Sequence, residues 1–200
     1  PPTIAPRRPI RPARRTSLWT SAGFGVVVDT LEAGSPHTWR WQAYLRPSVA
    51  MEGDAARVTL PNGKGVLLAW EPGPEARTTQ IEGFPRTEEK RSCRLDLLQT
   101  GRTARFLVLI APEAGSAAIR WAGEGVVEAT LDGCVHRLVV ENFGHRRVEL
   151  GGTSTAAAFV WQPGDGRLVE LASGEIAGVR PDTYELSDIE ADRDLQLPEF

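Results

Sequence analysis

Residues 37–45, His-Thr-Trp-Arg-Trp-Gln-Ala-Tyr-Leu, decide the fold of this chain. Hydrophobic and polar side chains alternate along them with a period of two, which is the period of a β-strand. One face of such a strand carries Trp39, Trp41, Ala43 and Leu45. The other face carries Thr38, Arg40, Gln42 and Tyr44. The stretch therefore predicts an antiparallel strand with one buried side and one side open to solvent.

The same alternation recurs along most of the chain, and no stretch shows a sustained helical pattern of apolar residues. Turn residues follow at intervals of about 8–12 residues, the spacing of all-β sandwiches and barrels. We expect a turn at 32–36 that separates a strand at 25–31 from the one at 37–45, and tight hairpins at 131–134 and 163–166. Further strands are expected at 56–60, 65–70, 77–83, 92–98, 103–110, 118–121, 126–131, 135–141, 146–150, 156–162 and 167–172. The sequence predicts an all-β fold, an antiparallel two-sheet β-sandwich.

Length and composition allow one ordinary domain. The chain has 200 residues, of which 41% are hydrophobic, enough to bury a core. It contains no apolar run near the roughly 18 residues of a membrane-spanning helix, and no apolar signal segment opens it. Because the first residue is not methionine, we expect a fragment of a longer protein.

Charge is unevenly distributed around a net value of −3. Residues 1–28 hold five arginines and no acid, whereas 182–200 hold seven acids and one arginine. We expect a basic, Pro/Arg-rich lead-in at 1–16, a sandwich domain at 17–175 and an acidic tail at 176–200. The overall balance gives no reason to expect nucleic acid as a partner.

Catalytic and metal-binding patterns are sparse. Cys93 and Cys134 form no Cys-x-x-Cys motif, and either one disulfide or, more in keeping with their apolar surroundings, two isolated buried thiols are expected. Alternation places Cys134 and His136 on one face, but a third ligand is missing, so no metal site is expected. His145 is expected in an exposed loop. Asp29 closes a run of three valines, where the commonest role is to cap the turn that follows.

Six tryptophans raise the question of sugar stacking, because a flat indole matches the apolar face of a pyranose. Most are expected in the core, since each lies in or closes an alternating run. Trp19 stands apart near the basic lead-in and is expected to be partly exposed.

Several of these stretches together resemble the heparinase II/III-like polysaccharide lyases. The resemblance rests on the paired Arg14-Arg15, the Gly-Val-Val-Val-Asp strand at 25–29, the His-Thr-Trp strand from His37 and the Tyr-Leu-Arg-Pro end at 44–47. Residues 65–70 and 105–112 also look like later strands of that family's C-terminal β-sheet region. His37 matches a position that looks structural in the family, and Tyr44 stands where the family has a second histidine.

The resemblance implies a parent enzyme that cleaves uronic-acid-containing polysaccharides by β-elimination, with a helical domain preceding the sandwich. The family's His-x-His-x-Asp motif and its zinc ligands are absent from these residues, so no catalytic residue and no cofactor is expected in this chain. Zinc would belong to the parent protein, as it does in some members. The implied partners are the anionic polysaccharide and the preceding helical domain, and the implied location is periplasmic or secreted.

The polar side of residues 37–45 is the candidate contact with anionic sugar, through Arg40, Gln42 and Tyr44. The commoner alternative for such a strand face is contact with solvent or with the preceding helical domain. Two alternatives stay open at this point. One is a stand-alone carbohydrate-binding sandwich, in which the tryptophans would be exposed. The other is a structural or interaction sandwich that assembles with itself or with other proteins.

Overall fold

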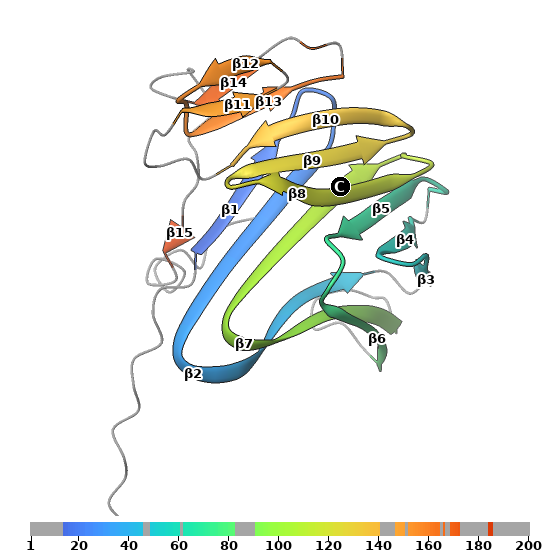
Figure 1. Cartoon of the computed structure of the whole chain (residues 1–200). Helices are drawn as coiled ribbons and strands as arrows, with labels where there is room; N and C mark the ends of the chain where they lie inside the picture. Colours follow the sequence, from blue (N-terminus) through green and yellow to red (C-terminus); the bar gives the residue numbers. More distant parts are fainter. Residues whose placement is uncertain are drawn as a thin grey trace, which may run out of the picture.

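The computed structural model is built of antiparallel sheets, and the residues that it describes contain no helix (Figure 1). The predicted all-β, sandwich-like fold is therefore confirmed. The described residues are 14–45, 49–60, 62–82, 91–140, 147–150, 152–164, 166, 169–172 and 184–185.

The first sheet has the strand order β15-β1-β2-β7-β5-β4-β3, and β6 pairs with β7 beside this path. Its strands are β1 (Arg14–Trp19), β2 (Gly25–Leu45), β3 (Val49–Met51), β4 (Ala55–Thr59), β5 (Gly65–Trp70), β6 (Glu75–Glu82), β7 (Arg91–Pro112) and β15 (Tyr184–Glu185). Two of them extend beyond the predicted sandwich segment: β1 starts inside the expected lead-in, and β15 pairs with β1 from within the expected tail. The rest of both terminal segments lies outside the described residues.

The second sheet has the order β14-β13-β10-β9-β8. Its strands are β8 (Ala117–Gly123), β9 (Val126–Leu131), β10 (Cys134–Val139), β13 (Phe159–Gln162) and β14 (Val169–Ala172). Strands β11 (Val148–Leu150) and β12 (Thr153–Thr155) form a separate pair. The predicted hairpin between β9 and β10 is confirmed, since Asp132 and Gly133 have φ angles of 48° and 80°, both in the left-handed region that such a turn requires.

The expected turn at 32–36 is wrong, and so is the division of β7 into two strands at 92–98 and 103–110. β2 pairs with β7 from Gly25 to Leu45, and the register is irregular only between Glu32 and His37. The small and turn-forming residues there bend one strand instead of reversing the chain, as a β-bulge does. On β7, a Cβ atom at Gly101 would lie 2.9 Å from the Thr103 carbonyl oxygen, so the bend needs a glycine at this position.

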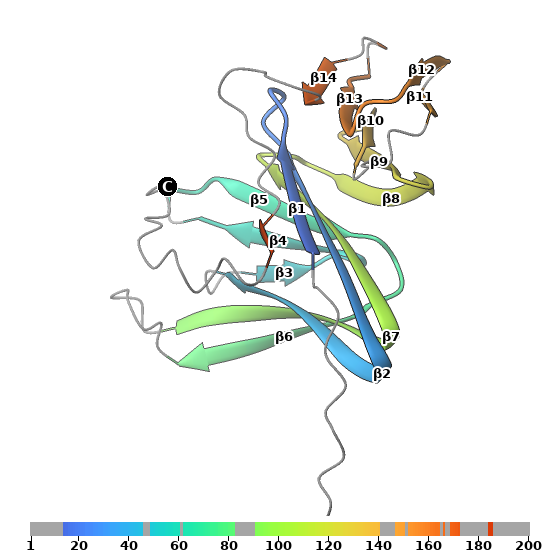
Figure 2. The same ribbon diagram turned by 90° about the vertical axis from the view of Figure 1, so that its left-hand side faces the viewer.

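The bend divides the first sheet into two arms (Figure 2). The lower arm consists of β6, residues 37–45 of β2 and residues 91–101 of β7. The upper arm is the remainder of the sheet. Two cores result. An intersheet core lies between the upper arm and the second sheet and includes Val28, Leu109, Leu138 and Phe159. An inner core lies within the bend and includes Trp41, Trp70, Leu97 and Phe106.

The predicted faces of residues 37–45 are confirmed. Trp41 is buried in the inner core, and Trp39, Ala43 and Leu45 are partly buried against it. The four polar residues that alternate with them are exposed. The lower arm therefore turns one side to the inner core and its other side to solvent.

Both cysteines are free thiols. Cys93 is buried, as expected, and its burial raises the pKa of the thiol. Cys134 is exposed at the start of β10, so the expectation that it is buried is wrong. The reason is its place directly after the β9–β10 turn, where β10 begins with an exposed residue before its side chains become buried.

Candidate functional site

The structure brings Arg40, Gln42 and Tyr44 together on the outer side of the lower arm. In register, they face Leu98, Asp96 and Arg94 of β7, and these in turn face Glu75, Arg77 and Thr79 of β6. We call the resulting three-strand surface the polar face. Its members are Arg40, Gln42, Tyr44, Glu75, Arg77, Thr79, Arg94 and Asp96.

Asp96 organises the middle of the polar face, although only 4% of it is exposed. Its carboxylate accepts a hydrogen bond of 2.9 Å from Gln42 Nε2 and forms an ion pair with Arg94, whose Nε lies 2.9 Å from Asp96 Oδ2. The hydrogen bond to Asp96 raises the pKa of Arg94, and the neighbouring Tyr44 hydroxyl adds to that rise. A buried carboxylate with such partners fixes side chains in place and is not available as a base.

The rim of the polar face is positively charged. Arg77 pairs with Glu75 at 2.7 Å, whereas Arg40 is exposed and has no hydrogen bond or ion pair to any other described residue. Three arginines against two carboxylates leave one net positive charge on a face of a chain whose overall charge is negative. Tyr44, 54% exposed, places an aromatic ring beside these cations. The arrangement suits the binding of a carboxylate or sulfate group on a flat polar ligand.

Sequence reasoning missed the β6 and β7 members of this surface. Arg94 and Asp96 alternate with apolar residues as clearly as Arg40 does, whereas Arg77 stands in a mostly polar stretch. That alternation shows which residues share a side of one strand. It does not show that β6 and β2 flank the same arm of β7.

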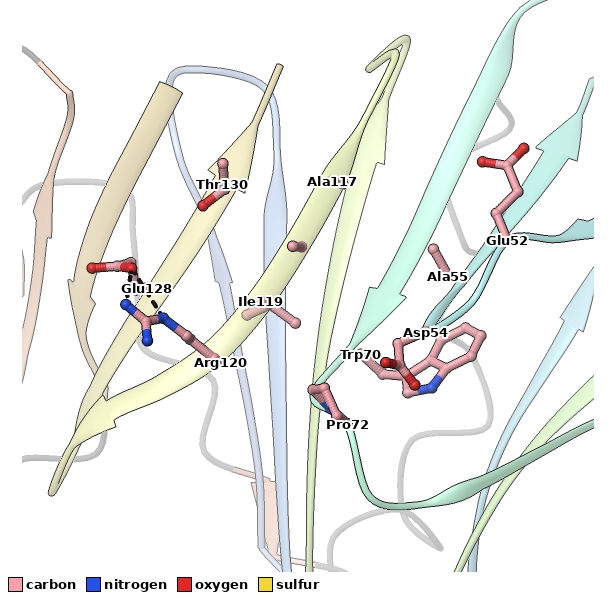
Figure 3. A pocket seen from close by; sticks show the side chains of 11 residues that line it. Glu52, Asp54, Ala55, Trp70, Pro72, Ala117, Ile119, Arg120, Glu128 and Thr130 are labelled. Atoms are coloured by element: carbon pink, nitrogen blue, oxygen red, sulfur yellow. Dashed lines mark hydrogen bonds and ion pairs between the residues drawn. The ribbon is translucent and has the colours of Figure 1, made fainter. Parts of the chain in front are cut away.

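Besides the polar face, the structure has a cleft between the two sheets, where the edge strand β8 approaches β5 (Figure 3). This cleft has a volume of about 420 Å³, within the range of small-molecule pockets. Its apolar lining comes from Ala55, Trp70, Pro72, Ala117, Ala118 and Ile119. The polar lining is Glu52, Asp54, Arg120, Glu128 and Thr130.

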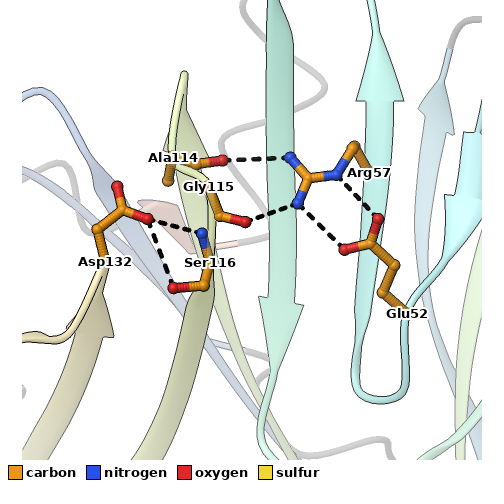
Figure 4. A network of polar contacts seen from close by, with 6 residues as sticks. All are labelled: Glu52, Arg57, Ala114, Gly115, Ser116 and Asp132. Carbon is orange, nitrogen blue, oxygen red and sulfur yellow. Dashed lines mark hydrogen bonds and ion pairs between the residues drawn. The ribbon is translucent and has the colours of Figure 1, made fainter.

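Most charged groups of the cleft are already paired. Glu128 accepts a 2.6 Å contact from Arg120 and lies 3.4 Å from Arg137. Glu52 binds Arg57, which also donates to the carbonyl oxygens of Ala114 and Gly115 (Figure 4). Arg57 thus ties β4 to the connection between β7 and β8. Ser116, in the same connection, donates its amide N–H to Asp132 of the β9–β10 turn at 2.7 Å, so this network fixes the two sheets at one end of the cleft.

The capping role expected for Asp29 is wrong. Asp29 is buried and forms a two-bond ion pair with Arg15, its direct neighbour across β1 and β2, at 2.7 and 2.6 Å. The partner lies 14 residues earlier in the chain, and a strand pairing, not a turn, brings it into reach.

His136 lies in the core, away from any catalytic partner. Its ring centroid is 5.0 Å from that of Phe24 and 6.2 Å from that of Trp161, and burial lowers its pKa. Among the described residues no three His, Cys, Asp or Glu side chains are grouped closely enough to hold a metal ion. His145 and the pair Glu88-Glu89 lie outside the described residues.

The tryptophans divide as expected. Trp70 and Trp161 are buried, and Trp121 is partly buried beneath Arg105, whose Cζ lies 3.4 Å from the ring centroid. Trp19 is 57% exposed. None of the described segments forms a helix long and apolar enough to cross a membrane.

Comparison with known proteins adds no relative: no protein-family model matches the chain, and no curated protein matches its sequence.

Proposed function

We propose that this chain is a carbohydrate-binding β-sandwich that holds an acidic polysaccharide against its polar face. The observation that carries the proposal is Arg40, an exposed guanidinium without a partner among the described residues, on the same face as Arg77 and the exposed Tyr44. Planar guanidinium groups recognise carboxylates by paired hydrogen bonds, and an aromatic ring offers a surface to the apolar side of a sugar.

Within that class, we propose that it is the C-terminal sandwich of a heparinase II/III-like polysaccharide lyase, without activity of its own. The support is the resemblance of residues 14–47 together with the all-β fold. The paired state of Asp96, Glu75 and Glu128 is consistent with binding as the role of this chain, since each of these carboxylates already holds an arginine.

The binding proposal is tested with polygalacturonate oligomers and their carboxyl-reduced counterparts, measured by calorimetry at two salt concentrations. Replacing both Arg40 and Arg77 by Ala should weaken binding about tenfold, since it removes two exposed guanidinium groups that can pair with the carboxylates of the ligand. Added salt should weaken binding by the unmodified chain more than by this variant.

Arg147→Ala is the matched control, because it removes an exposed arginine near β11, at the opposite end of the molecule from the lower arm (Figure 1). It should leave the affinity unchanged within a factor of two. Equal losses in the control and the double variant, or equal binding of reduced and acidic oligomers, would refute the polar face as the binding surface.

The family proposal has its own test. The coding sequence upstream of Pro1 should specify a helical domain and a His-x-His motif, and the extended protein should release unsaturated uronate that absorbs in the ultraviolet. An upstream region without these features refutes the family proposal and leaves the binding proposal standing.

A further inference from the structure

Trp19 ends β1 with its indole ring against the backbone of β2. A Cβ atom added to Gly25 would lie 2.9 Å from both Cδ2 and Cε2 of Trp19 and 3.0 Å from its Cε3. Three ring atoms at nearly equal distance mean that the indole turns its flat side to Gly25. Because 57% of Trp19 is exposed, the opposite flat side is open to solvent.

Arg15 lies on the same side of β1, four residues earlier. Alternation gives Arg15, Ser17 and Trp19 one common face, and their partners on β2 are Asp29, Val27 and Gly25. The Cα atoms of Arg15 and Trp19 are about 13 Å apart at the rise of an extended strand. That span accommodates two linked sugar rings along the strand.

The ion pair with Asp29 holds the guanidinium of Arg15 in place but occupies only two of its three nitrogens. Its Nε and Nη2 donate to the two oxygens of Asp29, whereas Nη1 has no hydrogen bond to any described residue. The Arg15 side chain is 57% exposed and that of Asp29 only 10%. The buried carboxylate therefore orients a guanidinium whose remaining N–H groups point away from it, as a preorganised anion site requires.

We propose that Trp19, Ser17 and Arg15 form a second saccharide site along β1 of the first sheet. One pyranose ring stacks on the free side of the Trp19 indole, and the carboxylate of the adjoining uronate pairs with Arg15 Nη1. The ligand class rests on the proposed function, but the site is distinct from the polar face. Trp19 and Arg15 share the side of the sheet that carries the inner core, and the polar face lies on the other side.

A purely structural role for Trp19, covering the exposed backbone at Gly25, makes a different prediction. In that case its removal changes stability and leaves affinity unchanged. The two roles are separated by measuring binding and unfolding on the same variants.

The test is calorimetric titration of polygalacturonate tetrasaccharide into the full chain, with urea unfolding in parallel. Trp19→Ala should weaken binding about tenfold, and Trp19→Phe, which keeps a smaller ring, about threefold. Gly25→Ala should also weaken binding, since the added methyl group displaces the indole without removing it. Met51→Ala, which shortens another exposed apolar side chain, is the control and should bind as the unmodified chain does.

Arg15→Lys keeps the positive charge but loses Nη1. It should weaken binding of the acidic tetrasaccharide more than binding of its carboxyl-reduced form. Unchanged affinity in both Trp19 variants overturns the proposal, as does equal weakening of both ligands by Arg15→Lys. Loss of binding in the Arg40 and Arg77 double variant alone overturns this site and supports the polar face. Loss in the Trp19 variants alone supports this site and overturns the polar face, and absence of binding by the unmodified chain overturns both.

Discussion

The ion pair between Arg15 and Asp29 should respond very differently to the loss of each partner. Asp29 is enclosed between β1 and β7, where its register neighbours are Arg15 and Phe106, whereas Arg15 reaches solvent. Arg15→Ala leaves a carboxylate that is only 10% exposed without its partner. Leaving a buried charge unpaired costs about 3 kcal/mol of unfolding free energy.

Asp29→Ala should cost less, about 1 kcal/mol, because the freed guanidinium can be solvated where it stands. The double variant should resemble Asp29→Ala and be about 2 kcal/mol more stable than Arg15→Ala. A second replacement that restores stability is the signature of an uncompensated charge, and a simple loss of contacts would not produce it.

Equilibrium urea unfolding at pH 7, followed by tryptophan fluorescence, measures all four chains. With a slope of about 1–3 kcal/mol per molar urea, the Arg15→Ala midpoint should fall by about 1–3 M at unchanged slope. An uncompensated Asp29 charge is excluded if Asp29→Ala is at least as destabilised as Arg15→Ala, or if the double variant is less stable than both single variants.

Two further predictions concern the core and the bend. Burial lowers the pKa of His136, so the unfolded chain takes up a proton before the folded chain does, and the free energy of unfolding should fall as pH drops below about 6.5 towards the lowered folded value. In urea titrations at pH 5 and pH 7.5, His136→Phe should reduce this pH dependence. Equal pH dependence in the two chains would contradict the assignment. Gly101→Ala should lower the free energy of unfolding by about 1–3 kcal/mol, because its methyl group meets the Thr103 carbonyl oxygen. Gly65→Ala, with open space at its Cβ, serves as the control. A thermal midpoint of Gly101→Ala no lower than that of Gly65→Ala would show that the bend tolerates a side chain.

Local pattern was enough to predict most of the strands, but it missed β1, β3, β12 and β15 and divided β2 and β7. Residues 37–45 place Trp41 inward and Arg40 outward in both the prediction and the structure. The bend was not predictable in this way, because Glu-Ala-Gly-Ser-Pro at 32–36 is equally suited to a turn and to a bulge. Only the continuous partner strand β7 distinguishes the two outcomes.

The candidate site was predicted in part for the same reason. Its β2 members follow from alternation, but Arg94 and Arg77 join them through pairings between distant parts of the chain. Asp29 shows the limit most clearly. A capping interaction needs only neighbouring residues, whereas the ion pair to Arg15 exists only once β1 lies against β2 in the correct register.

The long ladder between β2 and β7 also has a kinetic consequence. Its paired residues are separated in sequence by 48 positions at Leu45 and Cys93 and by 85 at Gly25 and Ile110. The chain must therefore close large loops before this ladder forms, and the entropy lost in closing them slows folding. Because the two strands line the intersheet core with one side and the inner core with the other, neither interior can be completed ahead of that event. The slow pairing of β2 with β7 therefore determines when water is excluded from both the intersheet core and the inner core.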